Sequence, residues 1–126
     1  MYYFDLLGKK FEYGAIGPDA YDCKGLMIEL FKRINVTFPA YDSSDEPAVQ
    51  SERFAEGLAK YAIPISVPET CCLVMFKIHP PFISHVGMML NPTQFIHITQ
   101  NSSVTVERID SLQWQRKIAG FYRLLA

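Results

Sequence analysis

The pattern of apolar and polar residues predicts one buried helix near the N-terminus, in the stretch from Tyr21 to Phe31. Its apolar side chains recur every three or four residues, at Leu26, Met27, Leu30, Phe31 and Ile34. Asp22 is a favourable N-cap for this helix, and Asn35 can end it. Cys23 then lies in the first turn, on the same face as Leu26, and the rest of the chain is organised around this helix.

Less regular patterns surround that helix. Residues 1–10 predict a short strand or helical turn, and turn-forming residues over 11–20 predict a loop. Residues 36–47 are expected to be irregular. A second helix with a looser apolar stripe is expected from about Pro47 to Ala62, and Pro64 ends any helix there.

Beyond Thr70 the pattern changes to short apolar or alternating runs, which predict strands. The expected strands are Cys71–Ile78, Ser84–Leu90, Gln94–Thr99, Val104–Ile109 and Ile118–Leu125. Turn residues at 91–93 predict a hairpin between the second and third, and residues 111–115 a turn or short helix. Helices followed by adjacent strands indicate an α+β fold with an antiparallel sheet of about five strands. Without a linker or repeat, we expect one domain over residues 1–126.

Composition narrows the possible functions. The net charge of −1 does not suggest a nucleic-acid partner, and no apolar stretch approaches membrane-spanning length. Three cysteines, two of them adjacent, argue against a disulfide framework. The first residues lack a basic segment followed by a long apolar run, so we expect no signal peptide.

Cys23 is the first candidate for chemistry. A thiol at a helix N-terminus is close to the positive end of the helix dipole, which lowers the thiol pKa and favours a nucleophilic thiolate. The alternative is a small buried core residue, because free cysteines are often buried. The predicted hairpin adds a base, since it places His85 and His97 almost opposite each other at one rim of the sheet. This predicts a Cys–His–His constellation with His85 as base and His97 as the residue that orients it.

The other candidates favour simpler interpretations. A histidine in a strand is often only a core or edge residue, and His79 in a loop is interpreted as a bystander. The adjacent Cys71 and Cys72 point to opposite faces of a strand, so they do not converge on a metal. Without a C-x-x-C spacing, structural zinc is disfavoured.

Several motifs taken together resemble a known family. They are Phe11–Ala15, Pro18, Asp22–Leu26, Cys71–Phe76, His85–Leu90 and Phe95–His97. In this order, and with twelve residues between the two histidines, they resemble the NlpC/P60 cysteine peptidases, a papain-like family of cell-wall endopeptidases. The segment from Val106 to Arg123 resembles the branch found in phage tails and tail-assembly proteins. The resemblance covers roughly residues 6–124.

The resemblance implies a papain-like fold and cleavage of peptidoglycan stem peptides between D-glutamate and diaminopimelate or lysine. Cys23 would attack as a thiolate, and the Cys23 backbone N–H would hold part of the oxyanion. His85 would activate water, and His97 would orient His85. Neither a metal nor an organic cofactor is required. The implied substrate-binding residues are Asp22, Lys24, Phe11, Tyr13 and Ser84.

The same resemblance implies a place of action. The protein would be made in the cytoplasm and would reach the cell wall through a phage tail or an injection machine, whose proteins would be its partners. The alternatives are an amidase, acyltransferase or deamidase toxin on a papain-like scaffold, or a non-catalytic tail-assembly subunit.

Three features depart from the family pattern. Phe11 replaces a tyrosine, Lys24 replaces the serine after the nucleophile, and Cys71-Cys72 replaces Gly-Asp before the first long strand. We expect these changes to alter specificity or reduce activity, without loss of the Cys–His–His group.

Overall fold

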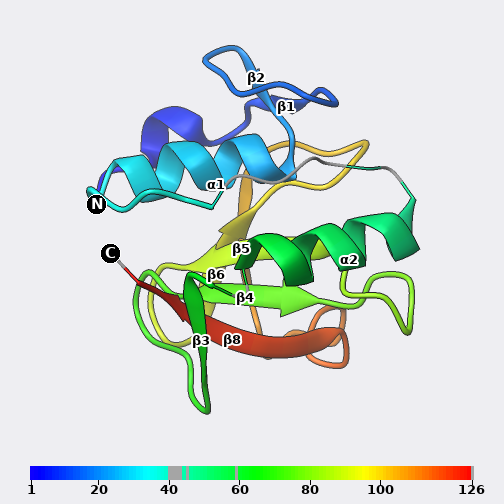
Figure 1. Cartoon of the computed structure of the whole chain (residues 1–126). Coiled ribbons are helices and arrows are strands. Elements are labelled where there is room, and N and C mark those ends of the chain that lie inside the picture. Colours follow the sequence, from blue (N-terminus) through cyan, green and yellow to red (C-terminus); the bar gives the residue numbers. More distant parts are fainter. Residues whose placement is uncertain (40–43, 45, 59, 126) are drawn as a thin grey trace.

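A six-stranded antiparallel sheet forms the centre of the computed structural model, which describes residues 1–39, 44, 46–58 and 60–125 (Figure 1). Its strands are β3 (Ala62–Ile65), β4 (Leu73–Phe76), β5 (His85–Met89), β6 (Gln94–His97), β7 (Thr105–Arg108) and β8 (Ile118–Leu124). The spatial order is β3-β8-β4-β5-β6-β7. Strands β4 to β7 are therefore neighbours in sequence and in space, whereas β8 returns to lie between β3 and β4. This is the predicted α+β fold.

The sequence pattern missed strand β3. The second helix was predicted to continue to Ala62, but α2 spans Pro47–Leu58 and Ala62 begins a strand. Pro64 is tolerated in β3 because this strand lies at the edge of the described sheet, next to β8. The pairing joins segments that are far apart in the sequence, so no local pattern could indicate it.

Helix α1 (Cys23–Lys32) forms as predicted, with Asp22 as its N-cap. Past its end, Asn35 adopts a positive φ of 61°, the left-handed conformation that stops a helix. Helices α1 and α2 cover the same face of the sheet (Figure 1). Their buried side chains, which include Leu30 and Phe54, pack there in one apolar core.

A smaller apolar core lies on the opposite face. It contains Phe76, Phe95 and Trp114, and Trp114 belongs to the segment of turns between β7 and β8. Cys71 packs against the helix-side core and Cys72 is buried in this second core, so they lie on opposite faces as predicted, although both precede β4 and the predicted strand began too early. The sheet is thus covered on both faces.

The N-terminal segment folds over the start of α1. A short 3-10 helix (Phe4–Leu6) is followed by β1 (Lys10–Phe11) and β2 (Ala20–Tyr21), two short parallel strands. Both strands include a residue of segment 11–20, which was predicted as a loop, so that prediction was incomplete.

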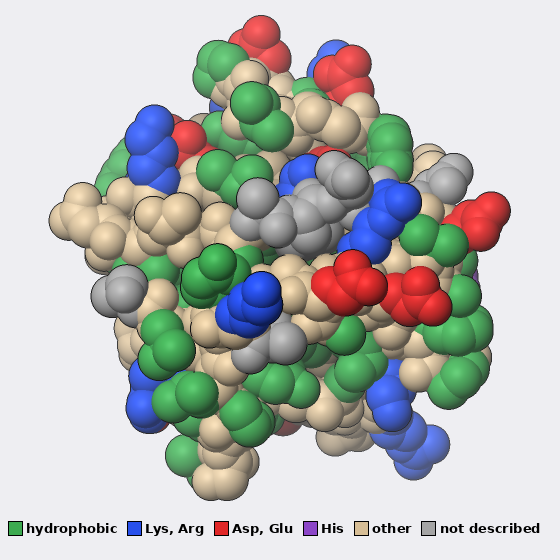
Figure 2. All heavy atoms as spheres, in the orientation of Figure 1, with side chains coloured by type: hydrophobic (Ala, Val, Ile, Leu, Met, Phe, Trp, Pro, Cys, Tyr) green, Lys and Arg blue, Asp and Glu red, His purple; other side chains and the backbone are tan. Residues whose placement is uncertain are grey.

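The surface and the helix lengths add two observations. Acidic and basic side chains are interspersed with hydrophobic ones over the visible face (Figure 2). None of the helices in the described part of the chain is long and apolar enough to cross a bilayer.

Gly25 controls how closely the N-terminal loop approaches α1. A Cβ at this position would lie 2.1 Å from the carbonyl oxygen of Ala15, a backbone atom that cannot move away cheaply. Although alanine is ordinarily the better helix former, we expect Gly25→Ala to lower the free energy of unfolding by about 1–3 kcal/mol. Urea denaturation measures this change.

Gly120→Ala is the matched control. A Cβ there lies 3.4 Å from the nearest atom of the flexible Tyr122 side chain, so we expect a change below about 1 kcal/mol. A stabilised Gly25→Ala variant would contradict the inference that the loop backbone lies too close to α1 for a side chain at position 25.

Candidate active site

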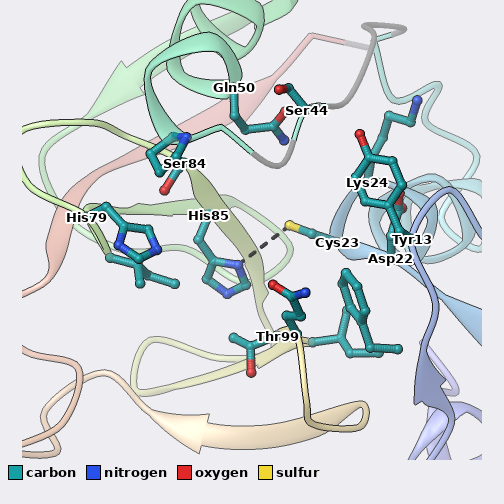
Figure 3. A pocket seen from close by; sticks show the side chains of 15 residues that line it. Tyr13, Asp22, Cys23, Lys24, Ser44, Gln50, His79, Ser84, His85 and Thr99 are labelled. Atoms are coloured by element: carbon teal, nitrogen blue, oxygen red, sulfur yellow. Dashed lines mark hydrogen bonds between the residues drawn. The ribbon is translucent and has the colours of Figure 1, made fainter.

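Asp22 fixes the position of the thiol. One of its carboxylate oxygens accepts the Gly25 N–H at 2.6 Å, and the other accepts the Gly14 N–H at 3.0 Å. The helix start and the N-terminal loop are thereby fastened to the same buried side chain. Cys23 follows directly, so its sulfur leaves the first turn of α1 in a defined direction (Figure 3).

The Cys23 sulfur lies 3.7 Å from His85 Nδ1 and 3.4 Å from the carbonyl oxygen of Val86. Because His85 is the first residue of β5, the contact joins the N-terminus of α1 to the end of a central strand. The predicted proximity of Cys23 and His85 is thus present in the structure (Figure 3).

The two histidines are hydrogen-bonded, although the predicted register is wrong. Met88 pairs with Ile96, and a Cβ on Gly87 would lie 3.3 Å from the His97 Cβ, so Gly87 and not His85 is beside His97. Strand side chains alternate, so a shift of two residues keeps both imidazoles on one face. The missing side chain of Gly87 leaves room for a diagonal contact, His85 Nε2 to His97 Nδ1 at 2.8 Å.

Glu107 extends this chain and was not among the predicted site residues. Its carboxylate is hydrogen-bonded to His97 Nε2 from the neighbouring strand β7. The alternation along the predicted fourth strand offered a signal, because it puts Glu107 and Thr105 on one face and Thr105 pairs with His97. The sequence alone did not show that this was also the imidazole face.

The carboxylate determines the direction of the hydrogen bonds. An ionised carboxylate only accepts, so the proton is on His97 Nε2 and His97 Nδ1 is left as an acceptor. His85 Nε2–H then donates to His97, which leaves His85 Nδ1 without a proton facing the Cys23 sulfur. The hydrogen bonds from Glu107 through His97 to His85 therefore present the unprotonated Nδ1 of His85 to the thiol as a base.

The second core encloses the imidazoles. His85 and His97 are only 4% and 1% exposed. Trp114 stacks on His85 with ring centres 6.0 Å apart and meets His97 edge-on at 4.8 Å, and Phe76 and Phe95 also contact the histidine rings. The aromatic side chains keep water away from the histidine pair and restrict its orientation.

Burial determines the protonation states. Burial raises the pKa of the Cys23 thiol to about 12, even though part of the Cys23 residue is still exposed. This increase outweighs the lower pKa expected from the helix dipole. Burial, and then the neighbouring His97, lower the pKa of His85 well below its ordinary value. Burial also lowers the pKa of His97, against the opposing effect of Glu107. Burial therefore favours a neutral thiol and neutral imidazoles in the free site.

A cleft of about 440 Å³ opens beside the thiol (Figure 3). All five predicted substrate-binding residues line it: Phe11, Tyr13, Asp22, Lys24 and Ser84. His97 does not line it, because it lies behind His85. The sequence interpretation missed other lining residues: Ser44, Pro47, Gln50, Ile78, His79, Ile98, Thr99 and Gln100.

A model of the NlpC/P60 family matches residues 8–123. The chain belongs to the NlpC/P60 family. Curated relatives named "Probable endopeptidase p60", from Listeria innocua and Listeria monocytogenes, are each 28% identical over 118 residues. These matches cover 94% of this chain and 22% of each relative, so the chain spans about a fifth of their length.

Solved structures of NlpC/P60 proteins share the fold. A lipoprotein-like member from Staphylococcus aureus has a TM-score of 0.69 at 19% identity, covering 96% of this chain and 38% of its own. NlpC2 from Trichomonas vaginalis gives 0.68 at 22%, covering 94% and 44%. The NlpC/p60 domain of the peptidoglycan hydrolase SagA gives 0.62 at 19%, covering 94% and 89%.

In this NlpC/P60 chain, the described residues contain no group of three or more His, Cys, Asp or Glu side chains placed to bind a metal. What the site does offer is a thiol, a base and a carboxylate-terminated chain of hydrogen bonds.

The neutral state of the thiol is testable by ultraviolet absorption. Since the pKa of Cys23 is raised to about 12 and that of His85 is lowered, we expect no thiolate band from Cys23 at pH 7. The measurement is the difference spectrum between the wild type and Cys23→Ala. Unfolded protein at alkaline pH provides the positive control, and a thiolate band in the folded protein at pH 7 would show an ion pair instead.

Glu107 is expected to stabilise the imidazolium that forms when His85 takes a proton. A hydrogen bond to a charged group contributes about 1.5–3 kcal/mol. Loss of this charge in Glu107→Gln should therefore lower kcat roughly tenfold to a hundredfold, with KM nearly unchanged. Glu69→Gln is the control, because its carboxylate pairs with Arg123 at the exposed surface and its loss should have little effect. An unchanged kcat in Glu107→Gln would contradict the role of Glu107.

Proposed function

We propose that this chain is a cysteine endopeptidase that cleaves peptidoglycan stem peptides. The observation that carries the proposal is the contact of the Cys23 sulfur with His85 Nδ1 beside the cleft, at 3.7 Å. Behind this contact, His97 and Glu107 continue the chain of hydrogen bonds. A thiol, a base and groups that orient the base are the parts that covalent amide hydrolysis requires.

In the first step the substrate carbonyl lies in the cleft next to Cys23. The thiol proton passes to His85 Nδ1 while the sulfur attacks the carbonyl carbon, so the carbonyl oxygen gains a negative charge. The Cys23 backbone N–H can donate to this oxyanion, because the first N–H groups of a helix have no carbonyl partner within the helix. The imidazolium of His85 is stabilised through His97 by the Glu107 carboxylate.

The tetrahedral intermediate then collapses. His85 returns its proton from Nδ1 to the leaving amine, the C–N bond breaks and a thioester to Cys23 remains. A water molecule gives a proton to His85 and attacks the thioester. The thiolate leaves, recovers a proton from His85, and a carboxylic acid product is released.

Family membership supports the proposed substrate. The Listeria relatives are named as endopeptidases and SagA as a peptidoglycan hydrolase. The finer assignment, the bond between D-glutamate and a diamino acid, comes from the motif resemblance. Delivery by a phage tail or an injection machine stays a prediction from the resemblance of the segment from Val106 to Arg123.

The predicted substrate-binding residues are proposed to act in different ways. Phe11, Tyr13, Lys24 and Ser84 line the cleft and can contact the stem peptide. Both carboxylate oxygens of Asp22 already accept backbone N–H groups. We therefore assign Asp22 mainly to holding the cleft wall, with Lys24 as the neighbouring charged group that a substrate meets.

Digestion of purified cell walls tests the function. We expect the wild type to release fragments cut between D-glutamate and the diamino acid, as identified by mass spectrometry of the muropeptides. Walls with diaminopimelate and with lysine in the stem should be compared. Cys23→Ala should release no such fragments, because the nucleophile is missing.

Cys71→Ala is the thiol control. Cys71 lies outside the cleft and packs against the helix-side core, so its removal should leave cleavage intact. Inactivity of the wild type on every wall type would overturn the proposal. Fragments carrying a transferred amine or a deamidated side chain in place of a cut would favour the acyltransferase or deamidase alternative.

A further inference from the structure

Gln50 is a buried polar residue that has no role in the mechanism proposed above. Among the residues that the structure describes, four polar or charged side chains are buried: Asp22, Gln50, His85 and His97. Three of them cap the helix or form the imidazole pair. Gln50 comes from α2, on the other side of the cleft from the helix that carries Cys23, and is only 6% exposed (Figure 3).

Its carboxamide has a fixed orientation. The backbone N–H of Ser44 donates to Gln50 Oε1 at 2.7 Å, which identifies that end of the amide as the oxygen. The nitrogen, Nε2, then lies on the other side of the amide. In Figure 3 the Gln50 side chain extends from α2 into the cleft toward the Cys23 sulfur, and Gln50 lines the cleft together with Cys23.

The proposed reaction needs a donor at this place. The Cys23 backbone N–H supplies one hydrogen bond to the oxyanion. The side chain of Phe11 also lines the cleft, but it has no N–H or O–H group and cannot donate a second one. We propose that Gln50 is a catalytic residue whose Nε2–H donates the second hydrogen bond to the oxyanion. This assignment rests on the proposed peptidase function and adds a residue to it.

The burial of Gln50 suits such a role. An oxyanion donor acts best when it is already oriented and shielded from water, because no reorganisation is then needed as the charge develops. The Ser44 N–H orients the amide, and α2 carries it on a regular element. Removal of one such donor typically lowers kcat about 10²–10³-fold.

Two substitutions separate donation from structure. Gln50→Glu keeps the size of the side chain and can still accept the Ser44 N–H, but its carboxylate cannot donate to an oxyanion and repels it. Gln50→Ala removes both groups. Glu52→Ala is the matched control, because it truncates an exposed side chain on the same helix.

The experiment compares hydrolysis of a purified stem peptide with alkylation of Cys23 by iodoacetamide. Alkylation forms no oxyanion, so it reports whether the thiol and His85 are intact. For Gln50→Glu and Gln50→Ala we expect kcat to fall about 10²–10³-fold, KM to change little, and alkylation to stay within about twofold of the wild type. Glu52→Ala should match the wild type in both assays.

The remaining outcomes overturn the assignment in distinguishable ways. An active Gln50→Glu alongside an active wild type would show that no donor is needed from Gln50. A parallel loss of hydrolysis and alkylation would show a structural role only. An inactive wild-type enzyme would overturn the proposed function and this assignment with it.

Discussion

The site depends on the contact that Asp22 and Gly25 make at the start of α1. The Asp22 carboxylate accepts backbone N–H groups from the helix and from the N-terminal loop, and Gly25 lets the Ala15 carbonyl approach the helix backbone. Together they hold the backbone at Cys23, from which the sulfur reaches His85.

The reacting groups come from opposite sides of the sheet. Cys23 is carried by the helix layer, whereas His85 and His97 lie among the aromatic residues of the second core. They meet at the end of β5, where the helix N-terminus extends past the strand. The two imidazoles are buried among aromatic rings, and Cys23 and one edge of His85 face the cleft. This division explains how buried neutral imidazoles can serve a substrate that arrives from solvent.

Local sequence patterns were sufficient to predict those parts of the site that are made by residues close together in the sequence. The stripe from Leu26 to Ile34, the N-cap at Asp22 and the hairpin with two histidines can each be predicted from neighbouring residues. The parts that were missed are made by residues distant in sequence. Strand β3 needs β8 as its partner, and Glu107 and Gln50 acquire their positions only through the packing of β7 and α2. The two-residue error in the hairpin register shows the same limit, because Gly87 determines the spacing of the imidazoles through a contact across the sheet.

The return of β8 to the middle of the sheet has a consequence for the order of folding. Strand β4 pairs with β5 on one edge and with β8 on the other, and β3 at the edge pairs with β8. As the chain leaves the ribosome, Cys23 and both histidines are made before the strand that closes the sheet beside β4. Trp114, which covers the imidazoles, is also made late. These three side chains are therefore synthesised early, but they are brought into a shielded arrangement only after residues 118–124 have docked, so a partly made chain carries the Cys23 thiol without its finished surroundings.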